Sequence, residues 1–540
     1  MTKVTEALEP VMAALRAQDL DRAADLAQAA LARGVEAALL LNLRAWRHEK
    51  AGRYDEALTD LLRARQLAPD DLSTLNALGL CLANLQRLPE AVEAFDTAIR
   101  VNPAFAPAHF NRGWVSEELG ELDQARASFE TAARVEPRDP NPLARLAALS
   151  ARASDWQAAR DLATRVLAVR PGDPTAGLAL ASAQGAEGDL RGAVVRLRAL
   201  AADPAISPID RAQAQGALGD ALDRLDRPVE AFAQFAAANQ TLRRFHAPRF
   251  SGPGVQTVPQ MLTWLARYFE AAPPAAWRGA SGPADSGRPD AHVFLLGFPR
   301  SGTTLLERVL TTSPRVMASE ERETLTEATV EWMRNPATLD RLAGISEADA
   351  ARHRRLYWER VRAFGDDPAG RVFIDKLPLN SIKLPLIAKL FPNAKVLFAV
   401  RDPRDVVLSC FRQRFRVNPS MFEFLTLEGA ARLYAQVMGL SELYRARFDL
   451  DLHTHRYEDL VSDFEATSQA VCTFIGIDWS ADMRRFDQHG ARRAIATPSA
   501  TQVSRGLYDG GGQWRRYADQ LTPAMRYLRP WIERFGYPAD

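Results

Sequence analysis

The sequence predicts a multidomain protein, with an N-terminal all-α superhelix of repeated helix pairs followed by a C-terminal α/β domain that contains a parallel sheet. Three observations carry this prediction. The 540 residues are too many for a single hydrophobic core. Residue types recur every 34 positions in the first half, and short apolar runs alternate with amphipathic stretches in the second. We expect repeats over residues 1–245, a linker with one helix over 246–290, and the α/β domain over 291–540.

The first half carries the 34-residue repeat. Proline and alanine mark two of its registers, at Pro69, Pro103, Pro137 and Pro171 and at Ala23, Ala57, Ala91, Ala125, Ala159 and Ala193. Residues 72–103 illustrate the spacing. Gly79 and Ala91 let two helices approach closely, and Phe95 fills the space between them. Pro103 then stops the second helix.

This pattern resembles the tetratricopeptide repeat, over about residues 4–245 and in some seven helix pairs. Such arrays stack into a superhelix with a concave face, on which they bind peptides or other proteins. We therefore expect a protein or peptide partner, which could be one on which the C-terminal domain acts, and no chemistry from the repeats themselves. A Pro/Gly/Ser-rich stretch around one amphipathic segment, QMLTWLARYFEA, forms the linker.

Short apolar runs alternate with helical segments after residue 290. The expected strands are HVFLLGF, RVFIDK and AKVLFAVRD, and the expected helices that follow them are TTLLERVLTTS, LNSIKLPLIAKLF and DVVLSCFRQRF. This alternation is typical of a parallel sheet covered by helices. Because ligands bind beyond the carboxyl ends of such strands, we expect PRSGTT, DKLP and RDPRD at one functional edge.

The turn at residues 299–304, PRSGTT, has the composition of an anion-binding loop. Gly302 allows close approach of the backbone, whose N–H groups point outward at the start of a helix. Arg300 adds a fixed cation, and Thr303 and Thr304 add hydroxyls. An ordinary N-capped helix is the alternative. A nucleotide kinase is disfavoured, because the turn lacks the lysine of the Walker sequence.

GFPRSGTTLLERVL and VLFAVRDPRDVVLSCF resemble the two signatures of sulfotransferases that use 3′-phosphoadenylyl sulfate. The resemblance continues through DKLP, YEDL and TPSATQVSRGLY, and it covers about residues 290–540. It implies a P-loop-like sulfotransferase fold and an enzyme that takes a sulfuryl group from this donor. The matching cofactor-binding residues are Arg300, Ser301, Gly302, Thr303 and Thr304 for the 5′-phosphosulfate and Arg401 and Ser409 for the 3′-phosphate.

Sulfuryl transfer resembles phosphoryl transfer, an in-line displacement that depends on positioning and on charge stabilisation. Arg300 and Lys376 are the expected catalytic cations, and no metal is required if they neutralise the leaving phosphate. Lys376 stands in DKLP at a strand end, in a chain with only six lysines. A compact ammonium group there suits the bridging oxygen. A solvated surface lysine is the alternative.

A general base must take the proton of the acceptor hydroxyl. SPRVMASEERETL follows the first signature at the distance at which tyrosylprotein sulfotransferases place a glutamate base. By that offset Glu320 is the expected base, with Glu321 beside it. Cytosolic sulfotransferases use a histidine instead, and no histidine of this chain stands in a comparable motif. An acidic first turn of a helix is the alternative explanation of EERE.

Three further residues are carried over from the resemblance. Ser499, expected to be both catalytic and cofactor-binding, and Arg505 match a loop that folds over the nucleotide in the relatives. Tyr457 matches a tyrosine near the 3′-phosphate or the adenine. The chain departs from the tyrosylprotein enzymes at Gln413, where they have arginine, and at Gln513, where they have lysine. The phosphate contacts at those two places stay open.

Net charge, apolar runs and cysteine spacing limit the partners and the compartment that we expect. Acidic and basic residues balance, 67 against 68, which speaks against nucleic acid or an anionic membrane surface as a partner. No stretch offers about 18 consecutive apolar residues and the N-terminus lacks a signal-peptide core, so we expect no membrane span and a cytoplasmic protein. The three cysteines, Cys81, Cys410 and Cys472, match no metal or disulfide spacing and are expected to be buried thiols.

Two classes of function remain open. The first is an enzyme that sulfates a hydroxyl, either that of a protein tyrosine, which a peptide-binding array beside a glutamate base favours, or that of a glycan or small molecule. The second is a non-catalytic adaptor whose C-terminal domain only binds nucleotide. The sequence contains every residue expected in the site, and this argues against the adaptor. These residues are Arg300, Glu320, Lys376, Arg401 and Ser409.

Overall fold

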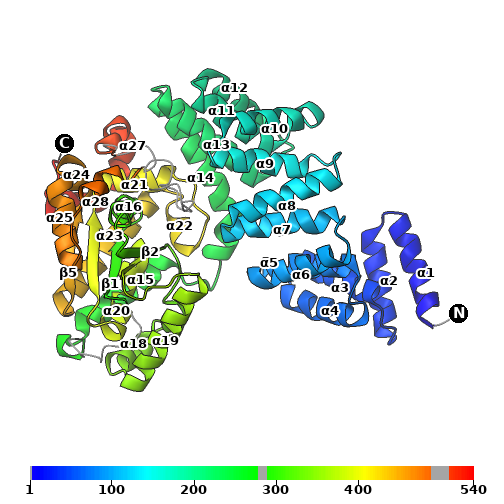
Figure 1. Ribbon diagram of the computed structural model, residues 1–540, viewed down its shortest axis with the longest axis horizontal. Helices are drawn as coiled ribbons and strands as arrows, with labels where there is room; N and C mark the ends of the chain where they lie inside the picture. The colour runs from blue at the N-terminus through cyan, green and yellow to red at the C-terminus, as the bar shows by residue number, and fades with distance from the viewer. Residues whose placement is uncertain (1–2, 278–288, 488–506, 508–509, 540) are drawn as a thin grey trace. The chain divides into compact units, whose positions relative to one another are not determined.

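The computed structural model describes residues 3–277, 289–487, 507 and 510–539. Its contacts divide the chain into two compact units, Met1–Ile206 and Ser207–Asp540. The expected fold class is confirmed, because helix pairs make up the first unit and a parallel sheet lies in the second (Figure 1).

The first unit consists of consecutive helix pairs. Its helices are α1 (Lys3–Arg16), α2 (Leu20–Ala32), α3 (Ala38–Lys50), α4 (Tyr54–Leu67), α5 (Leu72–Asn84), α6 (Leu88–Val101), α7 (Ala106–Leu119), α8 (Leu122–Val135), α9 (Asn141–Arg152), α10 (Trp156–Val169), α11 (Pro174–Ala186) and α12 (Leu190–Ala202). The α5–α6 pair shows why the spacing gives close packing. A Cβ atom on Gly79 would lie 2.4 Å from the ring of Phe95, which is fully buried with Ala91. Helix α6 ends two residues before Pro103, as predicted.

We expect Gly79→Ala to destabilise the first unit, because the added methyl group would overlap the Phe95 ring. Overpacking of this kind costs about 1–3 kcal/mol. Gly177→Ala on α11 is the matched control, since its added Cβ would lie 3.4 Å from the nearest side chain. We therefore expect Gly177→Ala to be neutral or slightly stabilising, because alanine in a helix is favoured over glycine by roughly 0.5–1 kcal/mol. Thermal unfolding followed by circular dichroism measures both changes, and equal stability of Gly79→Ala and the wild type would contradict the packing.

The second unit begins with two helices that continue the helix-pair pattern. Its helices are α13 (Pro208–Arg224), α14 (Pro228–Phe250), α15 (Val258–Ala271), α16 (Thr303–Leu310), α17 (Thr326–Trp332), α18 (Pro336–Ala343), α19 (Glu347–Ala363), α20 (Leu384–Leu390), α21 (Pro403–Arg412), α22 (Pro419–Glu423), α23 (Leu427–Arg447), α24 (Tyr457–Ser462), α25 (Phe464–Ile475), α27 (Ala518–Leu521) and α28 (Met525–Arg534). Short 3-10 helices are η1 (Pro274–Ala276), η2 (Pro378–Lys383), η3 (Ala481–Arg485), η5 (Gln513–Tyr517) and η6 (Thr522–Ala524). Helix α14 runs five residues past position 245, so the domain boundaries at residues 245 and 290 stay predictions.

Five parallel strands form the sheet that the structure describes. They are β1 (Ala291–Gly297), β2 (Val316–Glu320), β3 (Val372–Lys376), β4 (Lys395–Val400) and β5 (Asp451–Arg456), in the order β2-β3-β1-β4-β5. The sequence predicts β1, β3 and β4 but not the two edge strands. Lys376 pairs in register with Glu320 on one side and with Leu295 on the other, and Val400 pairs with Arg456. The carboxyl ends of all five strands therefore meet at one edge.

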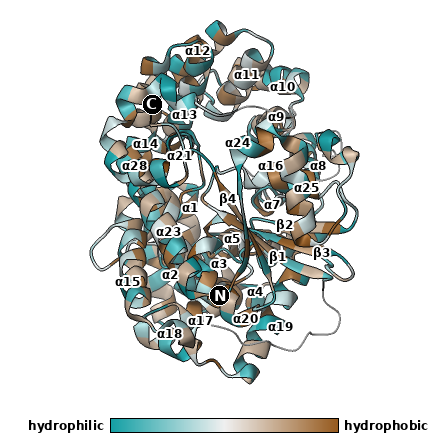
Figure 2. Cartoon of the chain, turned by 90° about the vertical axis from the view of Figure 1, so that its left-hand side faces the viewer, coloured by the Kyte–Doolittle hydropathy of each residue, from teal (hydrophilic) through white to brown (hydrophobic). Residues whose placement is uncertain are grey.

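Both faces of the sheet are covered by helices. Phe294 and Leu296 of β1 face a large core formed with α15, α19, α20 and α23. Val293 and Leu295 face a smaller core formed with α16 and α25. Burial on both faces explains why the central strands are continuous apolar runs (Figure 2). Among the described residues, no helix is both long enough and apolar enough to cross a membrane, and the three cysteines are buried free thiols.

Candidate active site

The loop between β1 and α16 has the shape of an anion cradle. Arg300 and Gly302 take left-handed backbone conformations, with φ values of 73° and 93°. A Cβ atom on Gly302 would lie 2.6 Å from the ring of Tyr457, so any larger residue would collide with it. Helix α16 starts at Thr303, and its first N–H groups have no partners within the helix.

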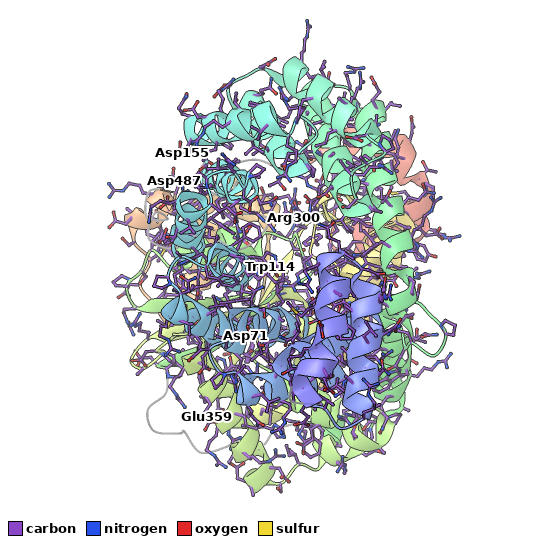
Figure 3. All side chains as sticks on the ribbon, turned by 90° about the vertical axis from the view of Figure 1, so that its right-hand side faces the viewer. Asp71, Trp114, Asp155, Arg300, Glu359 and Asp487 are labelled. Carbon is purple, nitrogen blue, oxygen red and sulfur yellow. The ribbon has the colours of Figure 1, made fainter. Side chains whose placement is uncertain are left out.

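Arg300, labelled in Figure 3, connects this loop to the segment after β4. Its Nε donates a hydrogen bond to the Ser409 hydroxyl at 2.9 Å, and its backbone carbonyl accepts one from Arg401 at 3.2 Å. The Arg401 guanidinium lies 4.5 Å from the centroid of the Tyr457 ring. Burial lowers the pKa of Arg300 to about 10, so the side chain still carries its charge at neutral pH. The structure thus brings together these four residues from three different strand ends.

Lys376, the last residue of β3, is fully buried between two carboxylates. Its Nζ lies 3.0 Å from Glu321 Oε1 and 3.2 Å from Glu307 Oε2. Burial by itself lowers the pKa of Lys376, but the attraction of Glu307 and Glu321 outweighs it and the pKa is raised. Burial raises the pKa of Glu307 to about 7. Lys376 is therefore a charged group inside the protein and not a solvated surface lysine.

The two adjacent glutamates at the end of β2 differ in their surroundings. Glu320 is the last strand residue and pairs in register with Lys376. Glu321 has a φ of 42°, and its N–H donates to the Lys376 carbonyl at 2.8 Å. Neighbouring residues at a strand end point to opposite sides. The Glu321 side chain lines the cavity described below, whereas Glu320 is not among the lining residues. The expected role of Glu320 stays a prediction, and the geometry favours Glu321.

A cavity of about 670 Å³ lies at the carboxyl edge of the sheet. It extends to both sides of β1. Toward β4 and β5 it is lined by Arg401, Ser409 and Tyr457, and toward β3 and β2 by Glu321. Apolar side chains line the β2 and β3 side as well, namely Met261, Met333, Leu379 and Ile382. The cavity therefore has a cationic side and a side that carries these apolar groups beside the charged Glu323 and Lys383, with the anion cradle between them.

Comparison with known proteins identifies the family. The model of the Sulfotransferase family matches residues 292–481, and models of the Tetratricopeptide repeat match residues 38–71, 76–142 and 110–174. Protein-tyrosine sulfotransferase 2 of Gallus gallus is 30% identical over 264 residues, which are 45% of this chain and 69% of that protein. The chain belongs to the sulfotransferase family.

A second relative aligns over a shorter share of its length. A protein of Aquifex aeolicus (strain VF5), described as uncharacterized, is 26% identical over 262 residues, which are 46% of this chain and 33% of that protein. Among solved structures, a tetratricopeptide repeat protein from Parabacteroides merdae aligns with 44% of this chain and 93% of that chain, at 16% identity and a TM-score of 0.37. The chain thus spans only about a third of the A. aeolicus protein.

A C-terminal segment completes the cavity wall of the sulfotransferase domain. The Gly510 N–H donates to the Tyr457 hydroxyl at 3.2 Å, and the Gly510 carbonyl accepts from Arg401 at 2.6 Å. The N–H groups of Gly512 and Trp514 donate to the Asp405 carboxylate at 2.7 and 2.8 Å. This segment therefore belongs to the edge of the sheet that holds the loop. The expected site residues Ser499 and Arg505 lie outside the described residues.

Sequence reasoning missed two carboxylates of the candidate site. Asp405 anchors the C-terminal segment, and although RDPRD was recognised, nothing in its spacing points to a partner more than 100 residues away. Glu307 contacts Lys376 from the first turns of α16. One signal for Glu307 was present, because an acidic residue in the middle of the apolar pattern TTLLERVL is rarely buried without a partner.

Proposed function

We propose that this protein transfers a sulfuryl group from 3′-phosphoadenylyl sulfate to an acceptor hydroxyl. One observation carries the proposal: the anion cradle, the Arg401–Ser409 pair and Glu321 line one cavity, and the buried Lys376 contacts Glu321 directly behind its wall. Membership of the sulfotransferase family supports the same reaction.

The residues present fit this donor. The cavity volume is in the range of small-molecule sites, roughly 300–1,000 Å³. Arg401 Nε is buried and has no hydrogen-bond partner among the described residues, as expected of a donor reserved for a ligand. We assign the loop N–H groups and Arg300 to the 5′-phosphosulfate, and Arg401 and Ser409 to the 3′-phosphate. Tyr457 lies between the two proposed phosphate sites, because it contacts Gly302 at one and Arg401 at the other.

The chain's own groups account for the charge changes of the transfer. The donor supplies a sulfuryl group on a phosphate leaving group. Arg300 and Lys376 stabilise the negative charge that develops on that phosphate. Glu321 takes the proton of the acceptor hydroxyl, because its carboxylate lines the cavity on the side away from Arg401. Lys376 contacts Glu321, so it holds the base in place before the acceptor arrives.

We propose a protein hydroxyl, with tyrosine as the first candidate, as the acceptor. The aligned relative from Gallus gallus is named for this residue, and repeat arrays of this type bind peptides. The apolar side of the cavity, with Met261, Met333 and Ile382, suits an aromatic ring better than a sugar. A glycan or small-molecule hydroxyl is the alternative acceptor.

Incubation with a labelled donor tests the proposal. Purified protein, 3′-phosphoadenylyl [³⁵S]sulfate and an extract of the source cells are combined, and the labelled product is identified. A labelled protein whose label maps to tyrosine supports the full proposal, and a labelled glycan or small molecule supports the alternative acceptor. Calorimetry tests the identity of the donor. Binding of ATP in preference to 3′,5′-adenosine bisphosphate would contradict the assignment of the donor. Nucleotide binding without any turnover would favour a non-catalytic adaptor.

We expect Arg401→Ala mainly to weaken donor binding, because β1 separates the end of β4, where Arg401 lies, from the strand ends that carry Lys376 and Glu321. Loss of a charged hydrogen bond of this kind raises the donor KM by roughly tenfold or more, with a small loss of kcat at saturation. Arg315→Ala is the control, since Arg315 precedes β2 at the opposite edge of the sheet and pairs with the exposed Asp290. Initial rates over a range of donor concentrations measure both. An unchanged KM in Arg401→Ala would remove it from the 3′-phosphate site.

A further inference from the structure

The last helix pair of the repeat pattern, α13–α14, packs directly against the sulfotransferase domain inside the second unit. Phe232 of α14 stacks on Phe411 of α21, with ring centroids 5.3 Å apart. The buried Asn239 side chain donates to the Phe411 carbonyl at 2.8 Å. These contacts join a repeat helix to the helix that carries Ser409, whose hydroxyl accepts from Arg300.

Asp223, near the end of α13, is the centre of this contact. Its side chain is only 12% exposed and forms an ion pair with Arg412. It also accepts hydrogen bonds from Arg516 Nη1 at 2.7 Å and from the Tyr517 hydroxyl at 2.6 Å. The Asp223 backbone carbonyl accepts a further one from Arg516 at 2.9 Å. One carboxylate from a repeat helix therefore holds two segments of the sulfotransferase domain that lie about 100 residues apart in the sequence.

Both segments line the cavity on its cationic side. Arg412 ends α21 and lies one helical turn after Ser409, so fixing Arg412 fixes the turn that carries the serine. Arg516 and Tyr517 belong to η5, which begins at the cavity residue Gln513. Without Asp223, the guanidinium groups of Arg412 and Arg516 would face each other without a shared counter-charge.

We propose that the last repeat is part of the donor-binding site, and that Asp223 is the positioning residue that holds α21 and η5 around the nucleotide end of the cavity. Two arginines from different segments share this one carboxylate, so the ion pairs fix both segments relative to each other. The neighbouring pair Asp220–Arg414, at 2.6 Å, lines the same wall. This inference rests on the proposed function, since it assigns that end of the cavity to the nucleotide.

Asp223→Asn tests the inference in the full-length protein. It keeps the shape of the side chain and removes its charge. We expect the Kd for 3′,5′-adenosine bisphosphate, measured by calorimetry, to rise at least about tenfold, as for loss of one partner of a buried charge pair. The donor KM rises with it, while kcat at saturating donor stays within a few-fold. Asp226→Asn is the control, because Asp226 also contacts Arg516 but its side chain is 89% exposed; we expect an unchanged Kd.

Each outcome decides between the alternatives. A lower melting temperature with an unchanged Kd in Asp223→Asn would make the residue merely structural and overturn the inference. If Asp223→Asn does not fold, Tyr517→Phe, which removes one hydrogen bond to Asp223, decides instead: a several-fold higher Kd supports the inference, and an unchanged Kd overturns it. If the wild type itself does not bind the bisphosphate, the proposed function fails first.

Discussion

Replacement of Lys376 by alanine should lower kcat by roughly a hundredfold or more, as expected when a preorganised charge contact to a developing anion is removed. Lys376 is fully buried and lies 3.0 Å from Glu321. On the proposed mechanism, the variant therefore loses the ammonium group that stabilises the leaving phosphate and that also holds the base. Glu307, whose pKa burial already raises to about 7, can take up a proton when its partner is gone, so the fold should survive.

Lys395→Ala is the matched control for this prediction. Lys395 is the first residue of β4, at the opposite edge of the sheet, and pairs with Asp451 at 3.1 Å. Its removal should leave kcat within a few-fold of the wild type. Lys376→Arg keeps the positive charge and changes the shape of the side chain. We expect its kcat to remain low, because a planar guanidinium does not fit the space of an ammonium group. Near-normal turnover in folded Lys376→Ala would remove the lysine from the catalytic residues.

Glu321→Gln should have the second large effect. The amide keeps the size of the side chain but cannot take the acceptor proton, and loss of a general base lowers kcat by about 10²–10⁴-fold. Donor binding should survive, because Glu321 lies on the side of the cavity away from Arg401. Rates at saturating donor and acceptor, together with calorimetry of 3′,5′-adenosine bisphosphate, separate the two effects.

Glu320→Gln is the control, and it also tests the alignment of the two glutamates. The sequence offset assigns the base to Glu320, whereas the cavity is lined by Glu321. We expect Glu320→Gln to retain most of the wild-type kcat. If Glu320→Gln is the impaired variant and Glu321→Gln is not, the sequence offset is correct and the geometric assignment is wrong.

The repeat array and the functional edge could be predicted from the sequence because their signals are local. Gly79 and Phe95 lie within one 34-residue unit, and each motif of the edge directly follows an apolar strand. The two strands that were missed, β2 and β5, are the edges of the sheet. Their sequences, VMASE and DLHTHR, lack the continuous apolar runs of buried central strands, and β5 is largely exposed or half-buried.

The rest of the site depends on non-local geometry. The left-handed backbone at Glu321 turns one of two adjacent carboxylates into the cavity, and nothing in the letters EERE distinguishes them. The burial of Lys376 requires Glu307 on a different helix. Asp223 lies 189 residues from Arg412, so its contact with the cavity wall follows only from the packing of the α13–α14 pair, through α14, on α21.

The strand order also has a stereochemical consequence for the reaction. With β1 in the middle of the sheet, the proposed function places the nucleotide of the donor toward β4, its 5′-phosphosulfate at the loop after β1, and the acceptor hydroxyl on the β2 and β3 side. The acceptor hydroxyl would then attack sulfur on the side opposite the departing nucleotide phosphate, which is the line that a single displacement needs. Such a site calls for both substrates to be bound at once, with one inversion at sulfur and no sulfated enzyme between two half-reactions. On this proposal, the order of the strands sets the direction of transfer.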